Sequence, residues 1–302
     1  VSTIIADGAN YVVGGNFTSI AGATRSSIAR LTAAGANDAT FNPGTGAVGG
    51  AVNAIARDAS GNFYLAGSFT NLNSTTVSRI GMLNSDGSAN GAAATFNTGT
   101  GVGADATLRA AVLDSTSQLI IGGDFLTYRN ATNNYYARVQ TGGTPGNADA
   151  NYNQGQEFGG GSPTAALRQP DGKLVIVGTF TSYNGVSRNR VVRVFADGAL
   201  DGSFDPAATL PAGTVDAVAR DSSGNLYFGG NFNGTAFPAT VTSKQLLAGN
   251  QAELTAASHG FVVGQSVTVS GVDSIFNQGP VAIAATTANT FTFIRPSSYT
   301  KS

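Results

Sequence analysis

The chain has 302 residues, of which only 11% are charged, and its formal net charge is −1. Its few basic residues are scattered, which excludes the basic face that a nucleic-acid partner requires. Cysteine is absent, which excludes disulfides, a thiolate nucleophile and a cysteine-bound zinc ion. No apolar stretch of about 18 residues occurs, so no membrane-spanning helix is predicted.

A short signature occurs five times along the chain: a strand that ends in glycine, then one residue, then phenylalanine. The signature phenylalanines are Phe17, Phe69, Phe125, Phe180 and Phe232, at spacings of 52, 56, 55 and 52 residues. A period this regular indicates a repeat architecture. We expect the glycine to let two backbones pass closely and the phenylalanine to fill the space between neighbouring units.

Each unit contains three clear strands and a weaker fourth. In the second unit, an alternating run at 52–57 precedes a turn at 60–61 and the signature strand, a third run follows at 80–83, and the unit closes at 96–99. No segment combines a helical apolar period with a cap and a stop, so no helix is expected. Four antiparallel strands at this period indicate a β-propeller blade. The alternative is a β-solenoid, whose rungs are usually shorter.

The fourth unit shows the pattern most fully. It has Asp-Gly-Lys-Leu-Val-Ile-Val-Gly-Thr-Phe-Thr at 171–181, Arg-Val-Val-Arg-Val at 190–194 and Asp-Gly-Ala-Leu-Asp-Gly-Ser-Phe-Asp-Pro at 197–206. These segments resemble the delta-60 repeat of propeller-like domains, and the resemblance covers residues 1–238. It implies four to five blades. That family occurs in bacterial surface and secreted proteins and in phage proteins, without a shared chemistry.

The period is lost from about residue 240. Strict alternation at 267–270 and 290–293 predicts β-strands. Together with His-Gly-Phe at 259–261 and Phe-Asn-Gln-Gly at 276–279, these segments resemble a small β-barrel module first named in ubiquitin-activating enzymes. The module recurs in phage tail and virion proteins, and no ubiquitin chemistry is implied.

The predicted fold class is therefore all-β. A repeat propeller-like domain of four to five blades is expected over 1–238, and a small β-barrel or sandwich domain with a linker over 244–302. Because the chain opens at Val1 inside a repeat strand, we interpret it as an excerpt of a longer polypeptide.

The sequence contains little that indicates chemistry. The acidic residues lie mostly in turns, where Asp caps the local backbone. His259 is the only histidine, and we interpret it as a turn residue, because a metal site needs several ligands. Arg30, Arg138 and Arg193 recur at one position of the repeat, where we expect each to bind a carboxylate or the next blade's backbone. We expect no enzyme activity, no cofactor and no metal.

The loops after the signature phenylalanines are the expected contact surface, because binding residues concentrate on exposed loops. In the third unit this loop carries Tyr128, Arg129 and Tyr135, and exposed aromatic rings beside an arginine suit stacking on sugar. These three residues are the candidate ligand-binding site, with a host-surface glycan as the ligand. Tyr136 lies on the following strand and is expected to be buried between blades.

Two functions agree with these observations. The first is a non-enzymatic structural protein of a bacteriophage virion, in a tail fibre, spike or head-surface appendage, involved in host attachment. Its expected partners are other virion structural proteins and further copies of the chain. The alternative is a secreted propeller protein at the bacterial cell surface that binds carbohydrate or protein.

Overall fold

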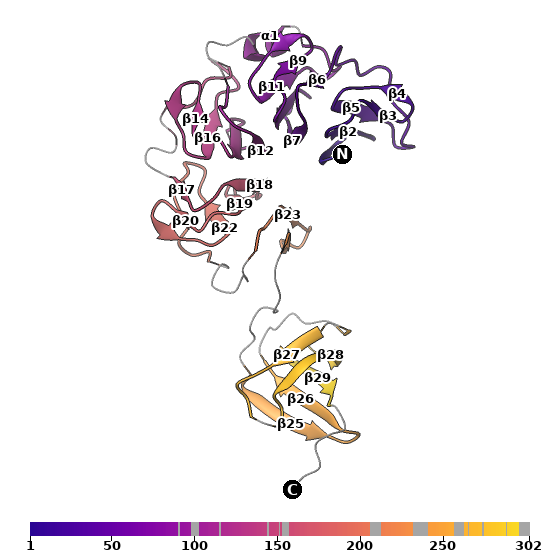
Figure 1. Cartoon of the computed structure of the whole chain (residues 1–302), viewed down its shortest axis with the longest axis vertical. Helices are drawn as coiled ribbons and strands as arrows, with labels where there is room; N and C mark the ends of the chain where they lie inside the picture. The colour runs from indigo at the N-terminus through magenta and orange to yellow at the C-terminus, as the bar shows by residue number, and fades with distance from the viewer. Residues whose placement is uncertain are drawn as a thin grey trace. The chain divides into compact units, whose positions relative to one another are not determined.

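The computed structural model of the chain is shown in Figure 1. It describes residues 1–89, 91–97, 103–114, 116–143, 145–150, 152, 157–205, 213–231, 241–256, 263–264, 266–273, 275–287 and 289–295. These residues form two compact units, one that reaches Asn231 and one whose described part starts at Val241. Each unit has a hydrophobic core of its own. Strands dominate both, so the predicted all-β class is confirmed.

Five antiparallel sheets in the described part of the first unit repeat one topology, and we call them blades 1 to 5 in chain order. In blades 1 to 4 the signature strand lies in the middle, and in blade 5 it pairs with the strand before it. Figure 1 shows the blades following one another in a curved row, from indigo to orange. The strands are β1 (Thr3–Asp7), β2 (Asn10–Gly14) and β5 (Ile28–Leu31) in blade 1; β7 (Val52–Arg57), β8 (Phe63–Gly67) and β11 (Ile80–Leu83) in blade 2; β12 (Leu108–Leu113), β13 (Leu119–Gly123) and β16 (Tyr136–Val139) in blade 3; β18 (Pro163–Arg168), β19 (Leu174–Gly178) and β22 (Val191–Val194) in blade 4; and β23 (Ala217–Arg220) and β24 (Leu226–Gly229) in blade 5.

Short strands beside the blades form small sheets from the loops after the signature phenylalanines, joined in blades 2 and 4 by a short strand from the segment before the first strand of the blade. They are β3 (Ser19–Ile20) and β4 (Ala23–Thr24); β6 (Ala47–Val48), β9 (Asn71–Leu72) and β10 (Thr75–Thr76); β14 (Thr127–Tyr128) and β15 (Ala131–Thr132); and β17 (Phe158–Gly159), β20 (Ser182–Tyr183) and β21 (Val186–Ser187). These loops are therefore ordered hairpins.

One short helix, α1 (Ala92–Asn97), occurs in the described residues, where no helix was expected. Its sequence, Ala-Ala-Ala-Thr-Phe-Asn, begins with the residue of highest helix propensity. Phe96 is buried in the core shared by blades 2 and 3. The Asn97 side chain accepts a hydrogen bond from Met82 N at 2.7 Å and donates one to Met82 O at 2.9 Å. Burial of Phe96 and the Asn97 contacts thus hold a helix that a sequence period could not reveal.

In blades 1, 3 and 4 the expected fourth strand is reduced to a single bridge. The bridges join Leu31 to Asn37, Val139 to Ala148, and Val194 to Leu200. The residue after each bridge is an aspartate, at 38, 149 and 201. In blade 4, Asp201 turns back to accept from Arg193 on β22 and caps the next turn by accepting from Ser203 N. That capping bends the chain away from the sheet and ends the pairing.

Neighbouring blades pack face against face. Tyr64 and Ala66 of blade 2 share one buried cluster with Leu119 and Ile121 of blade 3. We call the face that packs on the following blade the back face, and the face that packs on the preceding blade the front face. Blades 1 and 2 and blades 3 and 4 form clusters of the same kind. The core of the first unit is therefore a series of interfaces between blades.

The signature residues of blades 2, 3 and 4 have the expected roles, whereas Phe17 of blade 1 is only half-buried. Phe69, Phe125 and Phe180 are fully buried. A Cβ added to Gly67 or Gly178 would overlap a carbonyl oxygen on the neighbouring strand, from Ala51 and Ser162 respectively. Only glycine permits that approach of two backbones. Phe232 lies outside the described residues.

The second unit contains one five-stranded antiparallel sheet in the order β25-β26-β29-β28-β27. Its strands are β25 (Ser243–Leu247), β26 (Gln251–Thr255), β27 (Ser266–Val269), β28 (Gln278–Thr286) and β29 (Thr290–Ile294). The predicted strands at 267–270 and 290–293 thus correspond to β27 and β29. Leu254, Ile283 and Phe293 are central in a core on one side of this sheet. His259 lies outside the described residues.

Candidate functional site

Tyr128, the first predicted site residue, is fully buried, and the expectation that its ring is exposed is wrong. Its hydroxyl donates a hydrogen bond to Gly146 O at 2.7 Å. Tyr183 occupies the same place in blade 4 and donates to Gly198 O at 2.6 Å. Burial raises the pKa of Tyr128 to about 12, so the hydroxyl stays protonated and donates at neutral pH. The repeat uses this tyrosine to hold a turn of its own blade.

Arg129 and Tyr135 are half-buried and lie in different surroundings. Arg129 donates from Nη1 to Asn147 Oδ1 at 2.9 Å. Tyr135 packs against the cluster between blades 3 and 4, and its N–H donates to Phe125 O at 2.7 Å. The structure therefore does not bring the three predicted residues together on one exposed surface, and ligand binding at this loop stays a prediction that depends on Arg129.

Arg129 lines a pocket of about 290 Å³ in the first unit, which we call the Arg129 pocket. Its walls come from the β10–β11 loop, α1 and the loops of blade 3. The lining residues are Thr76, Val77, Ser78, Ile80, Phe96, Asn97, Gly103 and Arg129. A guanidinium, an amide and two hydroxyls around a space of this size can form hydrogen bonds to a small polar ligand such as a sugar. Sequence analysis missed the contribution of Asn97, because α1 that positions it was not predicted.

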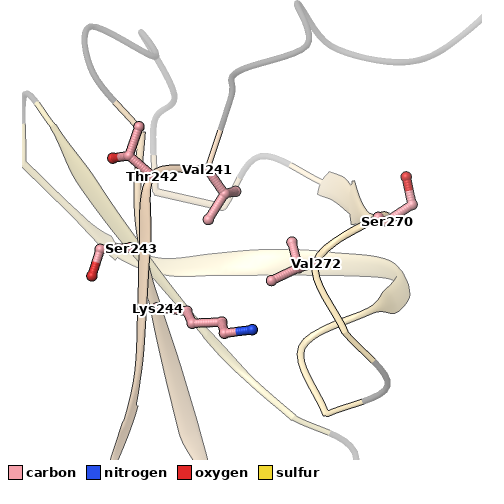
Figure 2. A pocket seen from close by; sticks show the side chains of 7 residues that line it. Val241, Thr242, Ser243, Lys244, Ser270 and Val272 are labelled. Carbon is pink, nitrogen blue, oxygen red and sulfur yellow. The ribbon is translucent and has the colours of Figure 1, made fainter.

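A second pocket, of about 480 Å³, lies in the second unit. It is bounded by residues 241–244, which lead into β25, and by 270–272, which follow β27. These are the two edge strands of the sheet. Figure 2 shows Val241, Val272 and the Lys244 ammonium directed into the space between the two segments, while Ser243 points away. The pocket therefore lies between the two edges of the sheet, and we call this place the seam.

An ion pair between Lys244 and Asp273 spans this seam. The ammonium also lies 5.6 Å from the centre of the Phe276 ring. The hydrogen bond from Lys244 holds the pKa of Asp273 below its ordinary value. Both side chains are substantially exposed, and the sequence carried no signal for this pairing because the two residues lie on segments far apart in the chain.

The recurrent arginines bind carboxylates, as expected. Arg30 donates to Asp38 at 2.8 Å, and its Nη1 donates to Ser85 O in the following blade at 3.0 Å. Arg193 donates to Asp201 at 2.8 Å, and Arg138 pairs with an aspartate in the same way. Each guanidinium also lies over an aromatic ring that closes the unit: Phe41, Tyr152 or Phe204. These charged pairs stabilise the ends of blades 1, 3 and 4.

Asp201 shows how strongly these contacts act. It accepts from the Ser203 hydroxyl at 2.6 Å, from Lys173 at 2.9 Å and from Arg193. The Ser203 hydrogen bond and the two cations hold the pKa of Asp201 well below its ordinary value. Within the described residues, no group of three or more His, Cys, Asp or Glu is placed to hold a metal ion. The same residues include no helix long and apolar enough to cross a membrane.

The profile of a family described as "Domain of unknown function (DUF5122) beta-propeller" matches residues 10–41 and 169–204. A comparison with curated proteins finds no match. Among solved structures, the chain is similar to a protein of unknown function from Bacteroides caccae, with 10% identity over 82% of each chain and a TM-score of 0.39. It is also similar to PorZ, an essential bacterial surface component of the type-IX secretion system of Porphyromonas gingivalis, with 16% identity and a TM-score of 0.36. That match covers 84% of this chain and 31% of PorZ.

Both TM-scores are low, so the class of the protein rests on the family match and on the sheets themselves. The two matched stretches contain the signature strands β2 and β19 of blades 1 and 4. The chain is a propeller-like repeat protein.

Proposed function

We propose that this protein is a non-enzymatic structural protein of a bacteriophage virion, in a tail fibre, spike or head-surface appendage. The blades provide a rigid scaffold, and the small barrel joins it to other virion structural proteins or to further copies of the chain. The finer family assignments, delta-60 repeats followed by a virion-type β-barrel module, belong to this proposal.

One observation carries the structural, non-catalytic part. The recurrent charged side chains of the blades bind one another at equivalent places, as the Arg193–Asp201 and Arg30–Asp38 pairs do. A catalytic acid or base has to reach a substrate, whereas these carboxylates are used to fasten a strand end to a turn. Their chemistry supports a scaffold in which charge stabilises each blade.

The Arg129 pocket supports the host-contact part of the proposal. Sugar hydroxyls accept hydrogen bonds from guanidinium and amide groups, and they can both donate to and accept from protein hydroxyls. The pocket carries all three kinds of group. We therefore assign glycan contact to Arg129, which lines the pocket, and not to Tyr128, which is fully buried.

The test of glycan contact compares Arg129→Ala with Arg25→Ala. Arg25 is a half-buried arginine in the corresponding loop of blade 1, so it controls for the loss of a loop charge. We expect Arg129→Ala to reduce adsorption to host cells and binding on a glycan array, with the melting temperature nearly unchanged. Equal adsorption of both variants and the wild type would contradict glycan contact at Arg129 and leave the pocket with a purely structural role.

A separate experiment tests where the protein is used. Antibodies against the chain are applied to purified phage particles and to intact bacteria from the same culture. Labelling of particles is expected. Labelling of the cell envelope with none on particles would contradict the virion function. It would favour the alternative function, a secreted bacterial cell-surface protein that binds carbohydrate or protein.

A further inference from the structure

The two ends of the row of blades expose faces whose equivalents elsewhere are buried. On the front face of blade 1, Ile4 and Tyr11 are 60% and 46% exposed. Their equivalents on the front face of blade 2 are Ile55 and Phe63, which are 5% and 0% exposed because blade 1 covers them. The front face of blade 1 is thus built like a covered face.

The back face of blade 5 has the complementary property. Its four residues are Ala217, Ala219, Tyr227 and Gly229, all exposed. Counted from the signature phenylalanine, they correspond to four residues on the back face of blade 2, namely Ala54, Ala56, Tyr64 and Ala66. Those four pack against blade 3. Blade 5 therefore repeats, almost residue for residue, a surface that this fold covers with a following blade.

Glycines reveal where the following blade would lie. A Cβ added to Gly14 on the back face of blade 1 would lie 2.6 Å from Val52 Cγ1 of blade 2. At the equivalent Gly122 of blade 3, it would lie 2.8 Å from Pro163 Cβ of blade 4. At Gly229 of blade 5, it would meet only Ala217 of its own blade, at 3.9 Å. The place above Gly229 is open in the described structure.

In blade 1, Val1 is equivalent to the residues that lie over these glycines in the other blades, such as Val52 and Pro163. A Cβ on Gly15 would lie 2.8 Å from Val1 Cα, as a Cβ on Gly123 would lie 2.8 Å from Leu108 Cα. Leu108 begins the first strand of blade 3 and is fully buried, whereas Val1 is 67% exposed. Val1 therefore belongs to the front face of blade 1, and nothing in the described structure covers it.

We propose that the back face of blade 5 binds the front face of blade 1 of a second copy of this chain, head to tail. Val1 of one copy would lie over Gly229 of the other, with Ile4 and Tyr11 against Tyr227. The contact repeats the interface that already joins each blade to the next, and it buries apolar and aromatic surface. This proposal specifies how the copies of the chain in the proposed function associate. It rests on that association alone and not on a location in a virion.

The experiment measures the mass of the full chain by sedimentation velocity over a wide concentration range. The wild type is expected to associate beyond its monomer mass of 30.3 kDa as concentration rises. Gly229→Val blocks one face and Ile4→Asp the other, so each variant alone should associate at least about tenfold more weakly. A mixture of the two variants should form a one-to-one complex, because each retains the face that the other has lost.

Val186→Asp is the matched control, since Val186 is an exposed valine of blade 4 outside both faces, and it should associate like the wild type. Ala217→Arg replaces Gly229→Val if the latter lowers the melting temperature. A wild type that is monomeric at every concentration, association that survives both face variants, or a mixture that stays monomeric would overturn the proposal. Antibody labelling of virions is a separate measurement. A negative labelling result would contradict the virion location but not the association measured by sedimentation.

Discussion

Tyr64 in blade 2 and Tyr227 in blade 5 make the same hydrogen bond in opposite surroundings. The Tyr64 hydroxyl donates to Asp58 at 3.2 Å, and the Tyr227 hydroxyl donates to Asp221 at 3.0 Å. Tyr64 is 2% exposed, whereas Tyr227 is 58% exposed. The local conformation is thus encoded within each repeat, while burial is supplied by the neighbouring blade.

This pair gives the first prediction. Tyr64→Ala should lower the free energy of unfolding by about 3–5 kcal/mol, because it empties an aromatic site between two blades. Tyr227→Ala should change it by no more than about 0.5–1 kcal/mol, as expected at an exposed site. Urea denaturation of both variants at a concentration where the chain is monomeric measures the difference. Equal losses would mean that the interface between blades 2 and 3 contributes little.

The second prediction concerns the glycine of the signature. Gly178→Ala should destabilise the first unit by about 1–3 kcal/mol or more, because the new methyl group would overlap the Ser162 carbonyl oxygen and backbone cannot easily move aside. Gly229→Ala is the control, since it is also a strand glycine but its Cβ would meet open space. Thermal denaturation compares the two. A neutral Gly178→Ala would contradict the close approach.

Acid should weaken blade 4 through Asp201. Its pKa is lowered in the folded protein, so its stabilisation is complete above the unfolded value of about 3.9 and is lost as pH falls toward the folded pKa. Asp201→Asn should cost on the order of 2 kcal/mol at neutral pH. The gap between the wild type and the variant should narrow below about pH 4.

Asp171→Asn provides the control for that measurement. Asp171 is exposed, and its carboxylate lies 4.0 Å from the ammonium of the same Lys173, farther away than that of Asp201 at 2.9 Å. The substitution should have little effect at any pH. Urea denaturation from pH 2 to pH 7 tests both variants, and a gap for Asp201→Asn that stays constant with pH would contradict the role given to its charge.

Alkali should act through the buried tyrosine of blade 3. Burial raises the folded pKa of Tyr128 to about 12, against about 10 in an unfolded chain. Its contribution is therefore complete below about pH 10 and is lost as pH rises toward 12, by about 2–3 kcal/mol in total. Tyr128→Phe should lack this part of the pH dependence while losing about 1 kcal/mol at neutral pH. Parallel pH curves for the two proteins would argue that the Tyr128 hydroxyl ionises as freely as in water.

The sequence alone determined the features that are local to a repeat. The signature glycine and phenylalanine, the three strands of blades 1 to 4 and the arginine that binds a carboxylate all follow from residues close together in the chain, whose spacing fixes strand faces and turns. Strands β27 and β29 of the second unit were also predicted from their alternation, because a two-residue period shows directly which side chains face a core.

Only the tertiary structure decided what each surface meets. Tyr128 and Tyr227 are both tyrosines on a β repeat, yet one is buried against its own blade and the other lies open. The helix α1 that carries Asn97 and the Lys244–Asp273 pair across the barrel seam depend on contacts between distant segments. A sequence period specifies which face of a strand is apolar, but burial is a property of the partner that covers that face. In the described structure, Ile4, Tyr11 and Tyr227 on the outer faces of blades 1 and 5 are exposed.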